Sequence, residues 1–211
     1  MIRMRELASF VAEREWTVEG ISVLRASVTL PRPVWEDTTA RRIHRFYQLQ
    51  ARSYLRYCES WLLPQAEAAY REALASSAPL PCFTARLDFR VTYQDDRFLS
   101  LYTQSREAGL PGQTLLTRHA DTWDLFTGYP VPLTSFCPRS GRKRLFAAAE
   151  AAIRQQEAAG VARYHENWRR RLRRHFNPQN YYLTEDGLAF FYPMYAIAPA
   201  IEGIPTFAAA R

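Results

Sequence analysis

The side chains that could do chemistry are spread along the chain without the spacing that an active site requires. The histidines show neither the HExxH pattern nor any other metal-ligand spacing. No serine lies in a GxSxG motif, and Gly109 and Gly112 lack the Gly-Lys-Ser/Thr sequence and the following helix of a phosphate-binding loop. We therefore predict no catalytic residue, no metal site and no cofactor. The histidines are His44, His119, His165 and His175.

Two pairs of polar residues are the remaining candidates for acid–base chemistry. His119 and Asp121 are two residues apart in a segment with strand character, so both would point to the same side of the strand. An isolated pair of this kind is typical of structural hydrogen bonding. Glu185 and Asp186 are adjacent in a predicted turn, where exposure to water gives no reason for a shifted pKa. A hydrolase that uses His119 and Asp121 in an unrecognised site is the alternative to a non-catalytic protein.

The three cysteines, Cys58, Cys82 and Cys137, are odd in number, widely separated and without a CxxC pair. This pattern argues against a disulfide framework and against a zinc site. We interpret them as thiols of the hydrophobic core.

The formal charge of +7 raises the question of an anionic partner. Lys143 is the only lysine among the 28 basic residues. The densest cluster, residues 169–175, lies in a helical pattern in which Arg163, Arg170 and Arg174 fall opposite the apolar stripe. That arrangement is typical of a solvated helix face. A weak contact between this face and nucleic acid is the alternative.

One α+β domain over residues 1–211 is predicted from the chain length and the 47% hydrophobic content. Residues 83–93 alternate strictly between apolar and polar side chains, which indicates an antiparallel strand with one wet face. Residues 97–105 and 113–123 would follow as further strands. A hairpin over residues 14–29 would precede them, with its turn at Glu19 and Gly20. We expect an antiparallel sheet of four to five strands packed against helices.

A long N-terminal helix is predicted over residues 38–76, because apolar residues recur there at three- and four-residue steps. Pro64 removes a hydrogen bond and clashes with the preceding turn, so we expect a kink there and a second helical piece over residues 65–75. A second helical region is predicted over residues 142–158, and the same pattern resumes over residues 161–176.

The C-terminal residues 177–207 contain the clearest hairpin. Aromatic-rich flanks, residues 181–183 and 188–192, enclose the turn residues 184–187. Three prolines then predict an irregular, packed segment instead of further strand. They are Pro193, Pro199 and Pro205.

Short sequences in this region carry a family resemblance: Tyr182–Leu188 (YLTEDGL), Tyr195–Pro199 (YAIAP) and Gly203–Pro205 (GIP). Another, Asp121–Gly128 (DTWDLFTG), lies upstream. Together they resemble the signatures of RsiV-type domains, which are the lysozyme-sensing ectodomains of anti-sigma factors. Such domains are also found attached to peptidoglycan deacetylases of the PdaC kind. The likeness covers residues 16–207.

The resemblance implies a non-catalytic recognition module that binds a protein, such as lysozyme, or a cell-wall-related glycan. One loop departs from the family, which has Thr-Gly-Gly-Ala-His-Gly where this chain has residues 107–113, so a histidine and one glycine are missing. This departure implies a lost or altered target. We expect the loop and the exposed aromatic segment after the hairpin to bind ligand. Their residues are Gly109, Leu110, Pro111, Gly112, Tyr192, Met194 and Tyr195.

No apolar run reaches the roughly 18 residues of a membrane span, and the first residues lack the apolar segment of a secretory signal. As written, the sequence predicts a cytoplasmic protein, although relatives of the RsiV type are often extracytoplasmic. The sequence also lacks the transmembrane helix of an anti-sigma factor and the deacetylase domain of the enzyme relatives. Neither of those specific activities is therefore predicted.

Overall fold

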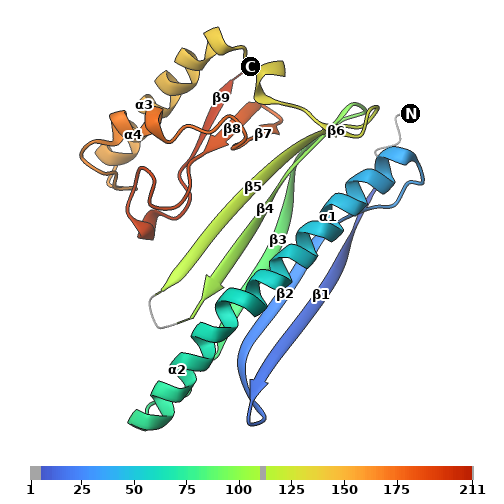
Figure 1. Cartoon of the computed structure of the whole chain (residues 1–211). Coiled ribbons are helices and arrows are strands. Elements are labelled where there is room, and N and C mark those ends of the chain that lie inside the picture. The colour runs from blue at the N-terminus through green and yellow to red at the C-terminus, as the bar shows by residue number, and fades with distance from the viewer. Residues whose placement is uncertain (1–5, 110–112, 211) are drawn as a thin grey trace. The chain divides into compact units, whose positions relative to one another are not determined.

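The computed structural model describes residues 6–109 and 113–210. The fold is α+β, as predicted, with a six-stranded sheet in the order β1-β2-β3-β4-β5-β6 and a three-stranded sheet in the order β7-β8-β9 (Figure 1). The expectation of four to five strands is therefore too low. The chain forms two compact units. Among the described residues, the N-terminal unit holds 6–89, 103–109 and 113–116, and the C-terminal unit holds 90–102 and 117–210.

The N-terminal unit begins with a long hairpin. β1 (Leu7–Val18) and β2 (Ile21–Pro33) are antiparallel, and Glu19 and Gly20 form the turn between them. Both turn residues have positive φ angles, 52° and 81°, as a two-residue turn of type I′ requires. The turn lies where the sequence predicts it, and β1 begins ahead of the predicted Arg14.

One long helix follows the hairpin. It consists of α1 (Thr38–Tyr57), a π-helical segment (Cys58–Leu62) and α2 (Leu63–Ser76). The side chain of Asp37 caps its start, because Oδ1 accepts a hydrogen bond of 2.6 Å from the backbone N–H of Ala40.

Pro64 does not end this helix. The π-helical segment lies immediately before it, and the N–H of Leu63 bonds to the carbonyl oxygen of Cys58. Pro64 then lies in the first turn of α2, a position that tolerates a missing N–H. At the place where the sequence predicts a kink, the structure has a π-helical turn, and the predicted second helical piece is α2.

β3 (Phe83–Gln94) pairs with β2 in parallel, from Leu24 opposite Phe83 to Val28 opposite Leu87. The prediction of a purely antiparallel sheet is wrong for this pair. The cause is the long helix between the two strands, because a helical crossover returns the chain to run in the same direction as before.

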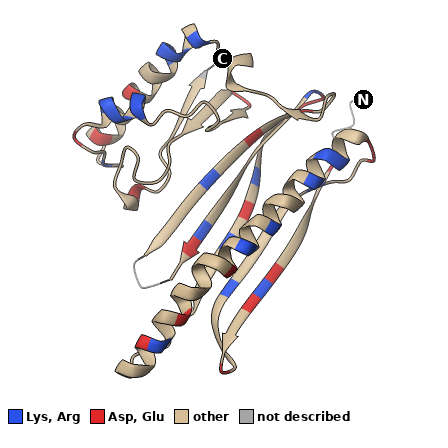
Figure 2. Ribbon diagram, in the orientation of Figure 1, with Lys and Arg blue, Asp and Glu red and all other residues tan. Residues whose placement is uncertain are grey.

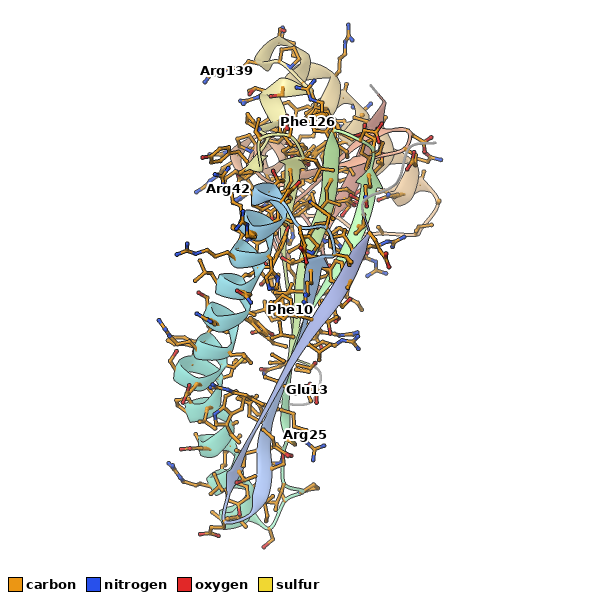
Figure 3. All side chains as sticks on the ribbon, turned by 90° about the vertical axis from the view of Figure 1, so that its right-hand side faces the viewer. Phe10, Glu13, Arg25, Arg42, Phe126 and Arg139 are labelled. Carbon is orange, nitrogen blue, oxygen red and sulfur yellow. The ribbon has the colours of Figure 1, made fainter. Side chains whose placement is uncertain are left out.

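The helix and the sheet bury the core of the N-terminal unit between them (Figure 3). Phe10 of β1 lies edge-on to the ring of His44 in α1, with ring centroids 5.8 Å apart. Burial of apolar surface, at about 25 cal/mol per Å², holds the helix on the sheet. The buried core residues are Val23, Leu24, Ala26, Cys58, Leu62, Ala66, Tyr70, Phe83 and Ala85.

The six-stranded sheet continues through β4 (Phe98–Ala108), β5 (Thr114–Asp124) and β6 (Tyr129–Pro130). β4 ends three residues beyond the predicted strand, and β5 is shifted by one residue from the predicted strand. Each of β3, β4 and β5 passes from one compact unit into the other.

The turn between β5 and β6 explains the residue types of the upstream family-like sequence. Oδ1 of Asp124 accepts hydrogen bonds from the N–H groups of Phe126, at 2.9 Å, and Thr127, at 3.0 Å. Gly128 follows with a φ angle of 69°. An aspartate that bonds to the backbone ahead of it and a glycine in the left-handed region form a tight turn.

In the C-terminal unit, α3 (Arg142–Ala158) matches the predicted second helix. The predicted continuation is helical only in α4 (Trp168–Arg174). Gly160 leaves the helical region with a φ angle of 66°, and the N–H of His165 bonds instead to the carbonyl oxygen of Ile197. This hydrogen bond to a distant segment takes the place of helical hydrogen bonds between α3 and α4. Three short 3₁₀-helices complete the unit: Leu133–Ser135, Arg139–Gly141 and Ala200–Glu202.

β7 (Tyr181–Thr184) and β8 (Gly187–Phe191) form the predicted C-terminal hairpin, and β9 (Thr206–Ala210) pairs with β8. β9 departs from the prediction, because the three prolines indicated no further strand. Pro205 directly precedes β9, and a sheet tolerates a proline at a strand start.

The hairpin is held in the core of the C-terminal unit. The rings of Phe190, Tyr192 and Phe207 pack together, with centroid distances of 5.7, 6.0 and 6.2 Å. The Tyr192 hydroxyl donates a hydrogen bond of 2.8 Å to the carbonyl oxygen of Leu172 in α4. The predicted C-terminal hairpin therefore packs in the core of its own unit.

All three cysteines are free thiols. Cys58 and Cys137 are buried, as predicted, but Cys82 is exposed, so the core interpretation is wrong for it. Cys82 precedes β3, and its sulfur lies 3.6 Å from Oγ of Ser22. No helix in the described ranges is long and apolar enough to cross a membrane.

Candidate binding site

Of the predicted loop surface, the structure describes Gly109; Leu110, Pro111 and Gly112 lie outside the described residues. Gly109 packs directly on the ring of Phe83. A β-carbon at position 109 would lie 2.7 Å from Cε2 of that ring. The close approach of backbone to a buried ring therefore accounts for a glycine at this position.

The predicted aromatic surface after the hairpin is only partly exposed. Tyr192 is completely buried, so it offers no surface to a ligand in this conformation and the expectation of an exposed ring there is wrong. Met194 is half-buried, and Tyr195 is 55% exposed. Burial of both faces of β8 draws Tyr192 inward, whereas Tyr195 lies beyond Pro193, in the irregular segment.

The backbone of Tyr195 has a φ angle of 68°, in the left-handed region that bulky residues rarely occupy. Its carbonyl oxygen lies 3.3 Å from Nε2 of His165. Strained backbone at an exposed aromatic residue is often associated with function. Tyr195 is therefore a candidate contact residue.

The other sequence candidates lie apart from any assembled site. His119 is exposed and Asp121 is half-buried on β5. Glu185 and Asp186 form the exposed turn between β7 and β8. Within residues 6–109 and 113–210, no group of three or more His, Cys, Asp or Glu side chains could hold a metal ion.

A half-buried arginine among aromatic rings lies in the C-terminal unit. The guanidinium of Arg118, on β5, lies 4.2 Å from the ring centroid of Tyr102 and 5.5 Å from that of Phe191. Its Nη1 donates a hydrogen bond of 3.1 Å to Oγ1 of Thr206. The ring of Tyr182 lies 5.4 Å from that of Tyr102 and 6.3 Å from that of Phe191. We call these five residues the Arg118 cluster.

The electrostatic setting of the cluster suits an anion. Burial lowers the pKa of Arg118, and the positive charge of Arg90 acts in the same direction, whereas the phenols of Tyr102 and Tyr182 act against it. The arginine nevertheless stays charged at neutral pH. Burial also raises the pKa of Tyr182, so its hydroxyl remains neutral and can donate a hydrogen bond. A guanidinium in such a site can bind a carboxylate through its paired N–H donors.

A second group of titratable side chains lies between α1 and β4 in the N-terminal unit. The buried carboxyl group of Glu107 accepts hydrogen bonds from Oη of Tyr57, at 3.0 Å, and from Oγ of Ser105, at 3.4 Å. Burial raises the pKa of Glu107, and it raises the pKa values of Tyr57 and Cys58 to about 12. Cys58 is thus a protonated thiol and not an activated nucleophile.

Sequence reasoning missed both groups, although a signal for them exists. Arg118 shares one face of β5 with Ala120 and Thr122, and Glu107 shares one face of β4 with Ser105. A charged residue at an inward-facing position of an alternating strand marks a polar group that the fold must accommodate.

Comparison with known proteins places part of the chain in a family. Residues 136–208 match the model of the family described as "Protein of unknown function (DUF3298)". This range includes Tyr182, Phe191 and Thr206 of the Arg118 cluster. No curated protein matches the chain.

Two solved structures share the fold. A member of the DUF3298 family from Bacteroides fragilis superposes with a TM-score of 0.66 at 15% identity, over 98% of this chain and 90% of its own. A DUF3298 family protein from Pseudomonas aeruginosa gives a TM-score of 0.58 at 16% identity, over 99% and 91%. Residues 136–208 therefore form a DUF3298 family domain, in a chain that has the fold of solved DUF3298 proteins.

Proposed function

We propose that this chain is a non-catalytic recognition module of the RsiV type, which binds a carboxylate-bearing, cell-wall-related ligand at the Arg118 cluster. The observation that carries the proposal is the guanidinium of Arg118 over two aromatic rings. Tyr182 opens the family-like sequence YLTEDGL, and Thr206 directly follows GIP. The family-like sequences thus contribute to, or adjoin, the residues that build the cluster.

The cluster has the properties of a preformed site. Stacking on Tyr102 and Phe191 and the bond to Thr206 hold the guanidinium, so binding would cost little side-chain freedom. Arg118 and Tyr102 are half-buried, so a ligand can still reach them. Peptidoglycan fragments carry carboxylates on both the sugar and the stem peptide, which is the chemistry that a guanidinium recognises.

The charge of the chain favours the same class of ligand. A net charge of +7 attracts anions over distances of about one Debye length, and Arg90 adds positive charge beside Arg118. Association should therefore weaken as the salt concentration rises.

Calorimetric titration tests the proposal. A soluble muropeptide with free carboxylates should bind saturably, and a neutral chitin oligosaccharide should not. Arg118→Lys keeps the charge but loses the planar fork, and it should weaken muropeptide binding roughly 10-fold. Arg144→Gln removes one exposed charge from α3 and serves as the control, which should bind like the wild-type chain.

A protein ligand is tested in the same series with lysozyme. Lysozyme could prove to be the one ligand of the two that binds saturably. If Tyr195→Ala then abolished this binding and Arg118→Lys kept it, the result would support a recognition function with its binding surface at Tyr195. The loop residues Gly109–Gly112 would then be tested next. No saturable binding of either muropeptide or lysozyme would overturn the recognition function.

A further inference from the structure

The outward face of α1 carries a row of arginines. The sequence of α1 contains five arginines and no acidic residue. Figure 2 shows blue bands along this helix. Arg41, Arg45, Arg52 and Arg56 are all exposed. At 100° per residue these four side chains fall within about 60° of each other, and they cover roughly 22 Å of helix length. We call them the arginine stripe.

The opposite face of α1 already has its partner. Ile43, Tyr47 and Ala51 are buried on that side. Because these buried residues fix the rotation of the helix on the sheet, the arginine stripe faces away from the core. Arg45, Arg52 and Arg56 form no ion pair within 4 Å with any described residue.

Large apolar side chains are exposed along the same helix. Leu49, which lies beside the stripe about midway along its length, is 53% exposed, and Trp61, in the π-helical segment, is 63% exposed. Phe46 is also exposed. A solvated helix face does not need these residues, and a phosphodiester chain would leave them in water. An interface between lipid headgroups and acyl chains accommodates both arginine and tryptophan.

We infer that the arginine stripe, with Leu49 and Trp61, docks this chain on the surface of a bilayer that contains anionic phospholipid. The arginines would contact lipid phosphates, and the apolar side chains would enter the headgroup region. This surface belongs to the N-terminal unit and does not involve Arg118, so the inference stands independently of the proposed function.

Co-sedimentation with vesicles tests the inference. The full chain should bind vesicles of phosphatidylglycerol and phosphatidylcholine in equal amounts, bind pure phosphatidylcholine vesicles far less, and be released as salt is raised. The fourfold variant R41Q/R45Q/R52Q/R56Q should bind the anionic vesicles roughly 600-fold more weakly, since each of the four basic residues near such a surface contributes about fivefold. Glutamine is a good helix former, so α1 should be retained.

A charge-matched variant separates local docking from net charge. R169Q/R170Q/R173Q/R174Q removes four exposed arginines from α4 and leaves the same net charge as the α1 variant. It should bind vesicles nearly as well as the wild-type chain. Equal losses in the two variants would overturn the inference, because they would show a response to net charge alone.

Tryptophan fluorescence supplies a second readout. Anionic vesicles should shift the emission of the wild-type chain to shorter wavelength, and Trp61→Phe should abolish most of that shift. An unchanged shift in Trp61→Phe would overturn the proposed orientation. Binding of heparin that depends on the stripe, with no binding to anionic vesicles, would overturn the bilayer as the partner.

Discussion

Glu107 is a buried acid whose protonation state acts on stability. Burial raises its pKa in the folded chain above the ordinary value for glutamate. A raised folded pKa stabilises the fold below the unfolded pKa of about 4.3, and this contribution is lost as pH rises through the folded pKa. The hydrogen bonds from Tyr57 and Ser105 offset only part of the cost of a buried charge.

Replacement of Glu107 by glutamine should therefore flatten the pH dependence. The free energy of unfolding of Glu107→Gln, measured by urea titration, should rise relative to the wild-type value as pH increases from 4 towards neutrality. Glu185→Gln, at an exposed turn, is the control and should follow the wild-type curve. Parallel curves for Glu107→Gln and the wild-type chain would contradict a raised pKa at Glu107.

Gly109 packs closely against the ring of Phe83. Gly109→Ala would place a methyl group 2.7 Å from the ring of Phe83, so it should destabilise the fold by about 1–3 kcal/mol. Phe83→Leu removes the ring that the methyl group meets. In a double-mutant cycle, the cost of Gly109→Ala should be smaller in the Phe83→Leu background. Additive costs would show that the contact does not cause the loss.

Residue-level predictions from sequence succeeded where a local pattern decides the outcome. Glu19 and Gly20 form the predicted turn, because a two-residue hairpin requires positive φ angles there. Tyr192 and Tyr195 are three residues apart, and only tertiary packing makes the first buried and the second exposed. Cys82 and Arg118 show the same limit, since burial depends on segments distant in sequence.

At the level of elements, Ser100 links β4 to the C-terminal hairpin. Its Oγ accepts a hydrogen bond of 2.8 Å from the N–H of Leu183 and shares another of 2.8 Å with Oγ1 of Thr122, and Ser100 is completely buried. Ser100→Ala would leave a buried backbone N–H without its acceptor. We expect a loss of about 1–3 kcal/mol in the free energy of unfolding.

Hydrogen exchange and denaturant titration would measure this effect. Ser53→Ala, at an exposed position of α1, is the matched control and should cost little. The amide of Leu183 should exchange faster in Ser100→Ala than in the wild-type chain. Unchanged protection at Leu183 would indicate that another group accepts the bond.

A helix or strand could be predicted from the sequence where its own residues determine its structure. The alternation of residues 83–93 predicts β3 directly, whereas the kink expected at Pro64 corresponds to a π-helical turn just before that residue. The parallel pairing of β2 with β3 follows from the crossover and not from either strand sequence. β9 could not be predicted from its own sequence, because an irregular segment separates it from β8, the strand with which it pairs.

For the whole molecule, the sharing of strands between the two compact units bears on cooperativity. β3, β4 and β5 each contribute residues to both units. Because each of these strands continues without a break from one unit into the other, we expect one cooperative unfolding transition. Far-ultraviolet circular dichroism and tryptophan fluorescence should give the same midpoint.

Variants in separate units sharpen this test. Gly109→Ala lies in the N-terminal unit and Ser100→Ala in the C-terminal unit. Each should lower a single midpoint seen by both probes. Two separate midpoints, each sensitive to one variant, would indicate two independently folding units.

The exposed thiol of Cys82 affects how all of these measurements are made. Cys58 and Cys137 are buried, and the pKa of Cys58 is raised to about 12, so air oxidation should act first at position 82. Two copies joined by a disulfide through Cys82 would carry two arginine stripes and two Arg118 clusters. Such a dimer would bind vesicles and glycans more tightly than a single chain, because two sites would bind at once. Samples kept with reductant, or carrying Cys82→Ser, would report the intrinsic affinity of a single chain.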